Sequence, residues 1–328
     1  MAKYELLGVG FADAFSDEDT ASLKGRGVET VRVADLVGFV STRPFRLLPR
    51  PANAAGRNIL RIQQKLEAIL AVEGFLPAAF GTAFDEREDV QAFLMLNKAT
   101  LRSSISTHGA FHQYQIAVTW RPERMLAALG QSAEVEALKA DGAARGKKEV
   151  ASALQSAAAA MCAAMSGDVV ERVTEASDQC RRIPVGDPPM IANLVCLVRP
   201  SGVGELETAL EEIDADYDDQ LLIKLSGPLP PCSFASIVKR DVSPEAVRNA
   251  KERIGVEDIS SMAAIKRAYK EFMKSAHPDV GGAAELADEG AKAYRLLKQL
   301  AAIETDLRAR LDHNKAISLC HVGASEAA

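Results

Sequence analysis

The stretch FLPAAFGTAFDEREDVQAFL, residues 75–94, carries the signals that decide the first half of the fold. Its apolar beginning predicts a short extended segment, which Pro77 and Gly81 interrupt because neither residue suits a regular strand interior. Gly81 predicts a tight turn or a positive φ. Residues 86–106 follow as a helix candidate. A strand and a helix joined by so short a turn indicate an α/β or α+β unit.

The elements on either side of this stretch mix strands with a helix in the same way. Apolar residues at Ile59, Ile62 and Leu66 follow helical spacing, whereas valine-rich segments with partial alternation predict strands. We therefore expect a first domain over residues 1–121. Its other expected elements are a strand over 4–9, one or two strands over 28–41, a helix over 56–72 and a strand over 113–120.

A second α/β unit follows, with a helical extension early in it. The extension is rich in alanine, which has the highest helix propensity. The proline-rich segment GPLPPCSF near its end predicts a rigid turn. We expect this domain over residues 122–240. Its segments are the helical pattern 122–182, the strands 190–200 and 221–227, the helix 203–213 and the turn 227–234.

The composition limits the possible functions. The 328 residues are 48% hydrophobic and 26% charged, as in a soluble protein of two or three domains. A net charge of −6 argues against a general nucleic-acid binder or anionic-membrane binder. The longest uncharged run, residues 150–167, is too weakly apolar to predict a membrane span, so we expect a packed or coiled helix there. The N-terminus does not resemble a signal peptide.

Neither a catalytic nor a metal-binding pattern stands out. The five cysteines are scattered without a CxxC pair, which fits a reducing cytosol and predicts neither a disulfide framework nor a zinc site. His108 and His112 are four residues apart, but Gly109 and the onset of a strand argue against one helix that presents both. We therefore expect no enzyme activity, no cofactor and no metal. An enzyme whose active-site residues lie far apart in the sequence is the alternative.

Near the C-terminus, the segment SAHPDVGG, residues 275–282, lies between two amphipathic helix candidates. Pro278 ends the first helix, and the two glycines after it free the turn. His277 and Asp279 could belong to a metal site, to a catalytic site or to a turn that another protein recognises. The flanking helices favour the last interpretation, because they predict an antiparallel hairpin with this turn at its end.

Residues 254–297, IGVEDISSMAAIKRAYKEFMKSAHPDVGGAAELADEGAKAYRLL, resemble the J-domain of Hsp70 co-chaperones. The resemblance implies that the HPD turn binds an Hsp70 such as DnaK and stimulates its ATP hydrolysis, while basic side chains steer the approach. Ala276 and Val280 stand where that family usually has tyrosine and lysine. A chance HPD turn, or a hairpin that no longer recruits Hsp70, is the alternative. The implied Hsp70-binding residues are His277, Pro278, Asp279, Lys266, Arg267, Lys270 and Lys274.

Two further motifs resemble the GvpF/GvpL family of gas vesicle proteins. FLPAAFGTAF matches the LP-x-x-FGT-x-F signature of that family, and GPLPPCSF is similar to its GPWPPYSF segment, with Leu229 and Cys232 in place of tryptophan and tyrosine. These residues either serve the structure, with Phe80 and Phe84 in the core, or bind a partner. The motif residues are Leu76, Pro77, Phe80, Gly81, Thr82, Phe84, Gly227, Pro228, Pro230, Pro231 and Phe234.

The two resemblances imply an α+β fold class with three parts. Over about residues 1–240 they imply a ferredoxin-like N-terminal domain and a second α/β domain with a helical or coiled-coil extension. An all-α J-domain-like hairpin follows over 241–328. The implied function is that of a cytoplasmic, non-enzymatic accessory protein of gas vesicle assembly, which binds the hydrophobic shell protein GvpA and acts with other Gvp accessory proteins. A general Hsp70 co-chaperone and a minor structural component of the vesicle are the alternatives.

Overall fold

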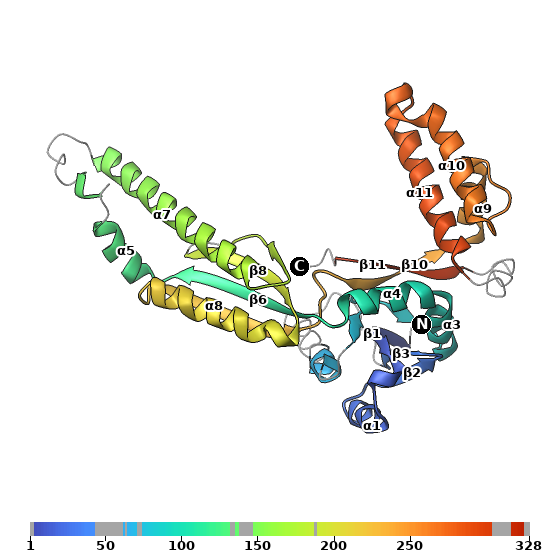
Figure 1. Cartoon of the computed structure of the whole chain (residues 1–328), viewed down its shortest axis with the longest axis horizontal. Helices are drawn as coiled ribbons and strands as arrows, with labels where there is room; N and C mark the ends of the chain where they lie inside the picture. The colour runs from blue at the N-terminus through green and yellow to red at the C-terminus, as the bar shows by residue number, and fades with distance from the viewer. Residues whose placement is uncertain are drawn as a thin grey trace. The chain divides into compact units, whose positions relative to one another are not determined.

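The computed structural model of the chain describes residues 3–42, 62, 64–70, 74–131, 135–137, 147–186, 189–303 and 316–324. Helices and antiparallel sheets are mixed along the chain, which confirms the expected combination of α and β elements (Figure 1). The described residues pack as two compact units. The first unit draws on the ranges 1–65, 74–107 and 235–323, and the second draws on 66–73, 108–234 and 324–328.

The first unit is built on an antiparallel sheet in the order β2-β3-β1-β4, with β5 also paired to β1. All six residues of β3 and the middle of β1 are buried, as expected for strands that are covered on both faces. Between β1 and β2, α1 begins with a capping box formed by Ser16 and Asp19. The bounds are β1 Tyr4–Phe11, α1 Asp17–Gly25, β2 Glu29–Val33, β3 Leu36–Ser41, β4 Phe75–Pro77 and β5 Ala83–Phe84.

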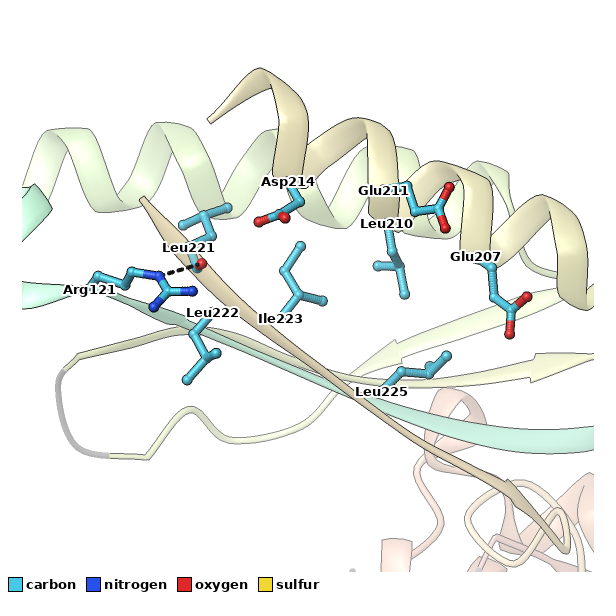
Figure 2. A pocket seen from close by; sticks show the side chains of 9 residues that line it. All are labelled: Arg121, Glu207, Leu210, Glu211, Asp214, Leu221, Leu222, Ile223 and Leu225. Atoms are coloured by element: carbon cyan, nitrogen blue, oxygen red, sulfur yellow. Dashed lines mark hydrogen bonds between the residues drawn. The ribbon is translucent and has the colours of Figure 1, made fainter. Parts of the chain in front are cut away.

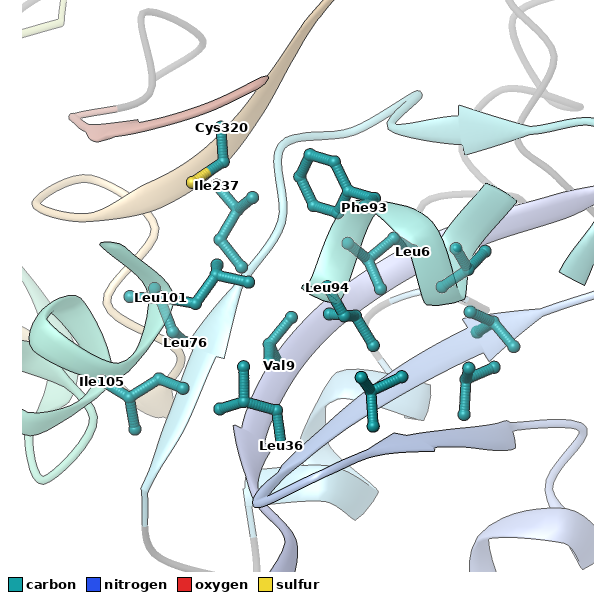
Figure 3. Close-up of a cluster of buried hydrophobic side chains, with 14 of the residues drawn as sticks. Leu6, Val9, Leu36, Leu76, Phe93, Leu94, Leu101, Ile105, Ile237 and Cys320 are labelled. Carbon is teal, nitrogen blue, oxygen red and sulfur yellow. The ribbon is translucent and has the colours of Figure 1, made fainter. Parts of the chain in front are cut away.

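The core of the first unit lies between this sheet and α3 (Arg87–Leu96). Phe93 and Leu94 of α3 are buried in one cluster with Leu6, Val9 and Leu36 of the strands (Figure 3). The same cluster includes Ile237 and Cys320, which are far away in the sequence. One continuous hydrophobic core therefore joins the N-terminal sheet to the C-terminal part of the chain.

The second unit has a sheet with the order β7-β8-β6-β9, and all its pairs are antiparallel. α7 and α8 cover one face of it, where Val169, Val173, Leu206 and Ile213 pack with every second residue of β6 and β8. α5 packs beside α7. The bounds are β6 His112–Trp120, α5 Pro122–Gly130, α7 Lys147–Glu175, β7 Gln179–Arg182, β8 Met190–Val198, α8 Val203–Asp216 and β9 Leu221–Leu229.

The C-terminal helices are carried by a two-stranded antiparallel ribbon of β10 and β11. α9 and α10 both pack on α11, around a core that includes Ile254, Ile265, Leu297 and Leu300. Short turns, among them the HPD segment, join the three helices (Figure 1). The bounds are β10 Ser236–Val242, α9 Pro244–Ile254, α10 Met262–Ala276, α11 Ala284–Ala301 and β11 Ile317–Gly323.

The ribbon belongs to the first unit rather than standing apart from it. Ala78 and Ile237 form a parallel bridge, and the Ala79 N–H donates to the Ile237 carbonyl at 2.9 Å. The expected division into three consecutive domains, over residues 1–121, 122–240 and 241–328, stays a prediction. The packing adds that described residues beyond 235 share one compact unit with the N-terminal sheet.

Several elements differ in detail from their prediction. The helix candidate 86–106 is two helices, α3 and α4 (Lys98–His108), because Asn97 departs from helical backbone angles, with φ −103° and ψ 12°. The helix predicted over 203–213 extends to Asp216. β11 was not predicted. The helix predicted over 56–72 lies partly outside the described residues, within which residues 64–70 are helical.

Candidate functional site

The first motif forms a turn that leaves β4 and re-enters the sheet as β5. β4 pairs with β1 so that Leu76 lies opposite Val9 and Pro77 lies opposite Gly8. Gly8 is required here, because a Cβ atom on it would lie 2.3 Å from the Phe75 ring. The Thr82 hydroxyl donates to the Ala79 carbonyl at 2.7 Å. The turn is therefore fixed by backbone pairing and by one buried hydroxyl.

The aromatic residues of this turn have different environments. Phe84 is buried against Phe93, with their ring centroids 5.3 Å apart, as expected. The expectation that Phe80 packs in the core is wrong, because 55% of its surface is exposed. Gly81 has φ +81°, which confirms the expected left-handed turn and places Phe80 at its tip. The turn thus combines a rigid base with an aromatic side chain at the surface.

The second motif closes the second unit with a proline turn. Pro230 and Pro231 are buried, and the Phe234 N–H donates to the Pro231 carbonyl at 3.0 Å. Phe234 packs on Val195 and Leu197 with the guanidinium of Arg181 over its ring. Gly227 adopts φ +151°, and a Cβ atom there would lie 2.6 Å from the Tyr114 ring. These contacts are those of a structural turn and fit the structural interpretation of Pro230 and Pro231, whereas Pro228 is exposed.

The HPD segment forms the exposed turn between α10 and α11. His277 leaves the helix with extended backbone angles, and its Nδ1 accepts a hydrogen bond from the Asp279 N–H at 3.1 Å. The side chains of His277 and Asp279 are 45% and 86% exposed. Gly282 lies against the backbone of Ala276, where a Cβ atom would be only 2.3 Å away. The helix–turn–helix geometry expected from the sequence is present, with the HPD side chains presented to solvent.

The basic residues of α10 form one exposed surface on the same hairpin. Lys266, Arg267, Lys270 and Lys274 are all exposed, and Lys274 pairs with Glu271 at 2.7 Å. The opposite side of the helix packs on α11, where the rings of Tyr269 and Tyr294 stack with centroids 4.4 Å apart. The hairpin therefore has a charged outer face and a fixed inner face, which suits a contact with an acidic partner surface.

A shallow groove of about 420 Å³ lies between α8 and β9 (Figure 2). Its rim carries the carboxylates of Glu207, Glu211 and Asp214, and its floor is formed by leucine and isoleucine side chains of β9. The groove contains neither histidine nor cysteine. It suits an apolar side chain flanked by a positive charge. The groove was not predicted, because α8 and β9 were expected only as separate elements.

The long helix α7 is largely exposed over its N-terminal half. By length and composition, residues 148–175 could cross a membrane, and this is the sole such helix among the described residues, but only 6% of its most apolar window is buried. Buried contacts begin at Met165, Val169 and Val173, toward its C-terminal end. Its earlier turns expose alanines such as Ala160. A helix was expected here, packed or coiled, and the packed part is the C-terminal half.

The described part of the chain holds no cluster of three or more histidine, cysteine or acidic residues that could bind a metal. His108 ends α4 and His112 begins β6, and burial lowers the pKa of His108.

Comparison with known proteins identifies the family. The family described as "Gas vesicle synthesis protein GvpL/GvpF" matches residues 8–236 of this chain. The crystal structure of the gas vesicle protein GvpF from Anabaena sp. PCC7120 is similar, with a TM-score of 0.53 at 17% identity, over 70% of this chain and 94% of that chain. That of GvpF from Microcystis aeruginosa has a TM-score of 0.50 at 15% identity, over 70% and 98%. A search of curated proteins finds no match.

Proposed function

The chain belongs to the GvpL/GvpF family of gas vesicle synthesis proteins, and from this membership we propose that it is a non-enzymatic accessory protein of gas vesicle assembly. In this role it binds the hydrophobic shell protein GvpA in the cytoplasm and acts beside other Gvp proteins. The family match covers 8–236, so the role rests on the two sheets and their helices. We infer a ferredoxin-like fold for each sheet, which the shared strand order supports.

The observation that carries the shell-protein role is the exposed apolar surface of α7. A shell subunit with a large apolar face aggregates when it is free in the cytosol. The N-terminal half of α7 offers small apolar side chains over several turns, and Leu126 of the neighbouring α5 is also exposed. Small side chains let a second helix approach closely. This surface is therefore suited to hold an apolar helix of the shell protein until assembly.

The test compares two double variants of α7 that add the same charge. Ala160→Glu with Ala164→Glu places two carboxylates on the exposed apolar side, whereas Ser152→Glu with Gln155→Glu adds them at polar positions. Glutamate keeps helix propensity high in both. Capture of purified shell protein by the full chain is expected to weaken about tenfold or more in the alanine variant only, since each buried carboxylate costs about 2 kcal/mol or more. Equal capture by both variants contradicts the proposal.

A second candidate function is the recruitment of an Hsp70 through the HPD turn. Its support is the exposure of His277 and Asp279 beside the basic face of α10. A J-domain contributes contacts only, and the chemistry belongs to the Hsp70. In combination with α7, such a turn brings an Hsp70 to the bound shell protein. The comparisons with known proteins support the family of the first 236 residues and not this part, so the Hsp70 contact rests on the geometry of the hairpin.

The Hsp70 contact is tested by ATP hydrolysis of the cognate Hsp70 with the purified full chain. Stimulation is expected, and His277→Gln is expected to abolish it without a change in melting temperature. Lys292→Gln is the matched control, because Lys292 is exposed on α11 and forms an ion pair with Asp288 of its own helix. Absence of stimulation by the unaltered chain leaves the shell-protein role intact and removes the Hsp70 role.

A further inference from the structure

Cys180 and Cys196 face each other across β7 and β8. The two residues are direct partners in the antiparallel register, and the Cys196 thiol donates a hydrogen bond to the Cys180 sulfur, with the two Sγ atoms 3.3 Å apart. We propose that this pair is a thiol modification site, at which a hydroperoxide oxidises Cys180 and Cys196 then closes a reversible disulfide.

The backbone geometry permits the disulfide without movement of the strands. The Ile183 N–H donates to the carbonyl of Asn193, which lies opposite it, so this pair is hydrogen-bonded. Hydrogen-bonded and non-hydrogen-bonded pairs alternate, so Cys180 and Cys196 occupy a non-hydrogen-bonded position, where opposite Cα atoms are about 4.5 Å apart. That separation lies within the range that disulfides span, so rotation of the two side chains is sufficient.

The two thiols differ in access, which assigns them different roles. β7 is the edge strand of its sheet, and Cys180 is half-buried there. Cys196 is fully buried on the interior strand β8. A hydroperoxide in solution therefore reaches Cys180 first, and Cys196 lies beside it as the resolving thiol.

The electrostatics favour the same assignment. The hydrogen bond from Cys196 has the largest influence on the pKa of Cys180 and, with the Thr174 hydroxyl and the charge of Arg182, outweighs burial and lowers that pKa to about 7. The same hydrogen bond, together with burial, raises the pKa of Cys196. Near neutral pH the half-buried Cys180 thus carries a substantial fraction of thiolate, which is the nucleophilic form, and the buried Cys196 keeps its proton.

The reaction balances in two steps. The Cys180 thiolate attacks the terminal oxygen of the hydroperoxide, the S–O bond forms, the O–O bond breaks, and the leaving alkoxide or hydroxide takes up a proton. Cys180 is now a sulfenic acid, oxidised by two electrons. The Cys196 sulfur then attacks Cys180, the S–S bond forms, and the hydroxyl leaves with the Cys196 proton as water. A dithiol reductant reverses the change by thiol–disulfide exchange.

The other cysteines of the chain can be compared with Cys180 by the pKa of their thiols. Cys162 on α7 is also half-buried, but burial raises its pKa. Burial raises the pKa of Cys232 to about 11 and that of Cys320 to about 12. Oxidation is therefore expected to select Cys180 over the other cysteines, rather than to follow exposure alone.

The experiment treats the reduced full chain with hydrogen peroxide and maps the products by mass spectrometry of an unreduced tryptic digest. The expected product joins peptide 173–181 to peptide 183–224, because trypsin does not cleave between Arg199 and Pro200, and the number of titratable thiols falls from five to three. Cys196→Ser is expected to stop at a sulfenic acid on Cys180, which dimedone traps. Cys180→Ser is expected to lose at least about tenfold in the rate of peroxide consumption, because the thiol with the lowered pKa is removed.

Cys162→Ser is the control and is expected to form the linked peptides at the unaltered rate. A dithiol reductant should restore five thiols. The proposal is overturned if the linked peptides do not form, if Cys162 is modified before Cys180, or if Cys196→Ser leaves Cys180 unmodified. Circular dichroism of each variant shows that it is folded before its reactivity is compared.

Discussion

The two sheets of this protein share one strand order but differ in what they support. In each, the second, third, first and fourth strands lie side by side, as β2-β3-β1-β4 and as β7-β8-β6-β9. The first sheet is bound by its core and by buried polar groups to the β10–β11 ribbon, which carries three helices. The second bears a long, largely exposed helix and a thiol pair on its edge strand. A shared topology therefore fixes a scaffold, while the added segments determine what each unit offers to a partner.

Polar side chains make the ribbon part of the first unit. The Asn97 Nδ2 donates to the Phe93 carbonyl at 2.8 Å and to the Ser318 carbonyl at 3.0 Å, and its Oδ1 accepts from the Cys320 N–H at 2.8 Å. The Lys239 ammonium lies 4.9 Å from the centroid of the Phe84 ring. The buried side-chain amide of Asn97 thus joins α3 to β11, the strand that follows the three C-terminal helices in the sequence.

The largest effect is expected from the core that both parts of the first unit share. Phe93→Ala removes a fully buried ring that packs with Phe84, Ile237 and Cys320, and should lower the free energy of unfolding by about 3–5 kcal/mol. Met95→Ala on the same helix is the control, because Met95 is exposed and should change the value by less than about 0.5 kcal/mol. Calorimetry measures both. A loss below about 1 kcal/mol for Phe93→Ala contradicts the shared core.

The next effect concerns the second unit and changes its thiol pair. Formation of the Cys180–Cys196 disulfide should raise its free energy of unfolding by about 3 kcal/mol, because the bond closes a loop in the unfolded chain. Trp120 is the only tryptophan and is buried in β6, so its fluorescence during urea unfolding follows this unit. The oxidised and reduced forms of the same protein are compared. If the oxidised and reduced forms unfold at the same urea concentration, the disulfide does not form at an unstrained position.

A smaller effect tests the polar connection between α3 and β11. Asn97→Ala leaves two carbonyls and one N–H without their side-chain partner and should cost about 2–3 kcal/mol. Hydrogen exchange should show the loss of protection first at the Cys320 amide. Met95→Ala is the control, because Met95 is exposed on the same helix and Asn97 keeps its contacts with β11. Unchanged protection of β11 in Asn97→Ala would falsify the role of the amide.

The smallest effect is a pH dependence on the ribbon. Burial acts to raise the pKa of Asp241, but hydrogen bonds from Ser318 and Lys239 outweigh it and hold that pKa below its usual value. Because the pKa is lower in the folded state, the stability from this group is present above the unfolded pKa and is lost as pH falls through the folded one. Ser318→Ala should therefore be less stable than the unaltered chain at neutral pH, and the difference should shrink in acid. A constant difference between pH 7 and acid rules out this linkage.

Much of the local structure could be predicted from the sequence. Valine-rich alternation located β2, β3 and β6, and the turn at Gly81 followed from the absence of a side chain. The hairpin around His277 followed from two amphipathic patterns that a proline separates. In each case the signal and the structure lie within one or two turns of the same segment, where residue propensities act directly.

The failures concern contacts between distant segments. Phe80 was expected in the core because an aromatic residue beside a strand usually packs inward, but the left-handed turn at Gly81 directs it to the surface. Asn97 was missed because its partners on β11 are more than two hundred residues away. The cysteines were judged by their spacing along the chain, so the register that brings Cys180 opposite Cys196 was invisible.

By itself, the sequence determined where most strands, helices and turns form and which family residues 8–236 belong to. Those properties depend on residue type and on short-range periodicity, which a single segment contains. The tertiary structure alone decided that β11 completes the first unit, that α7 leaves its apolar surface exposed, and that two scattered cysteines meet at 3.3 Å. Strand register and burial depend on which distant segments pair, and many pairings are compatible with the same local pattern.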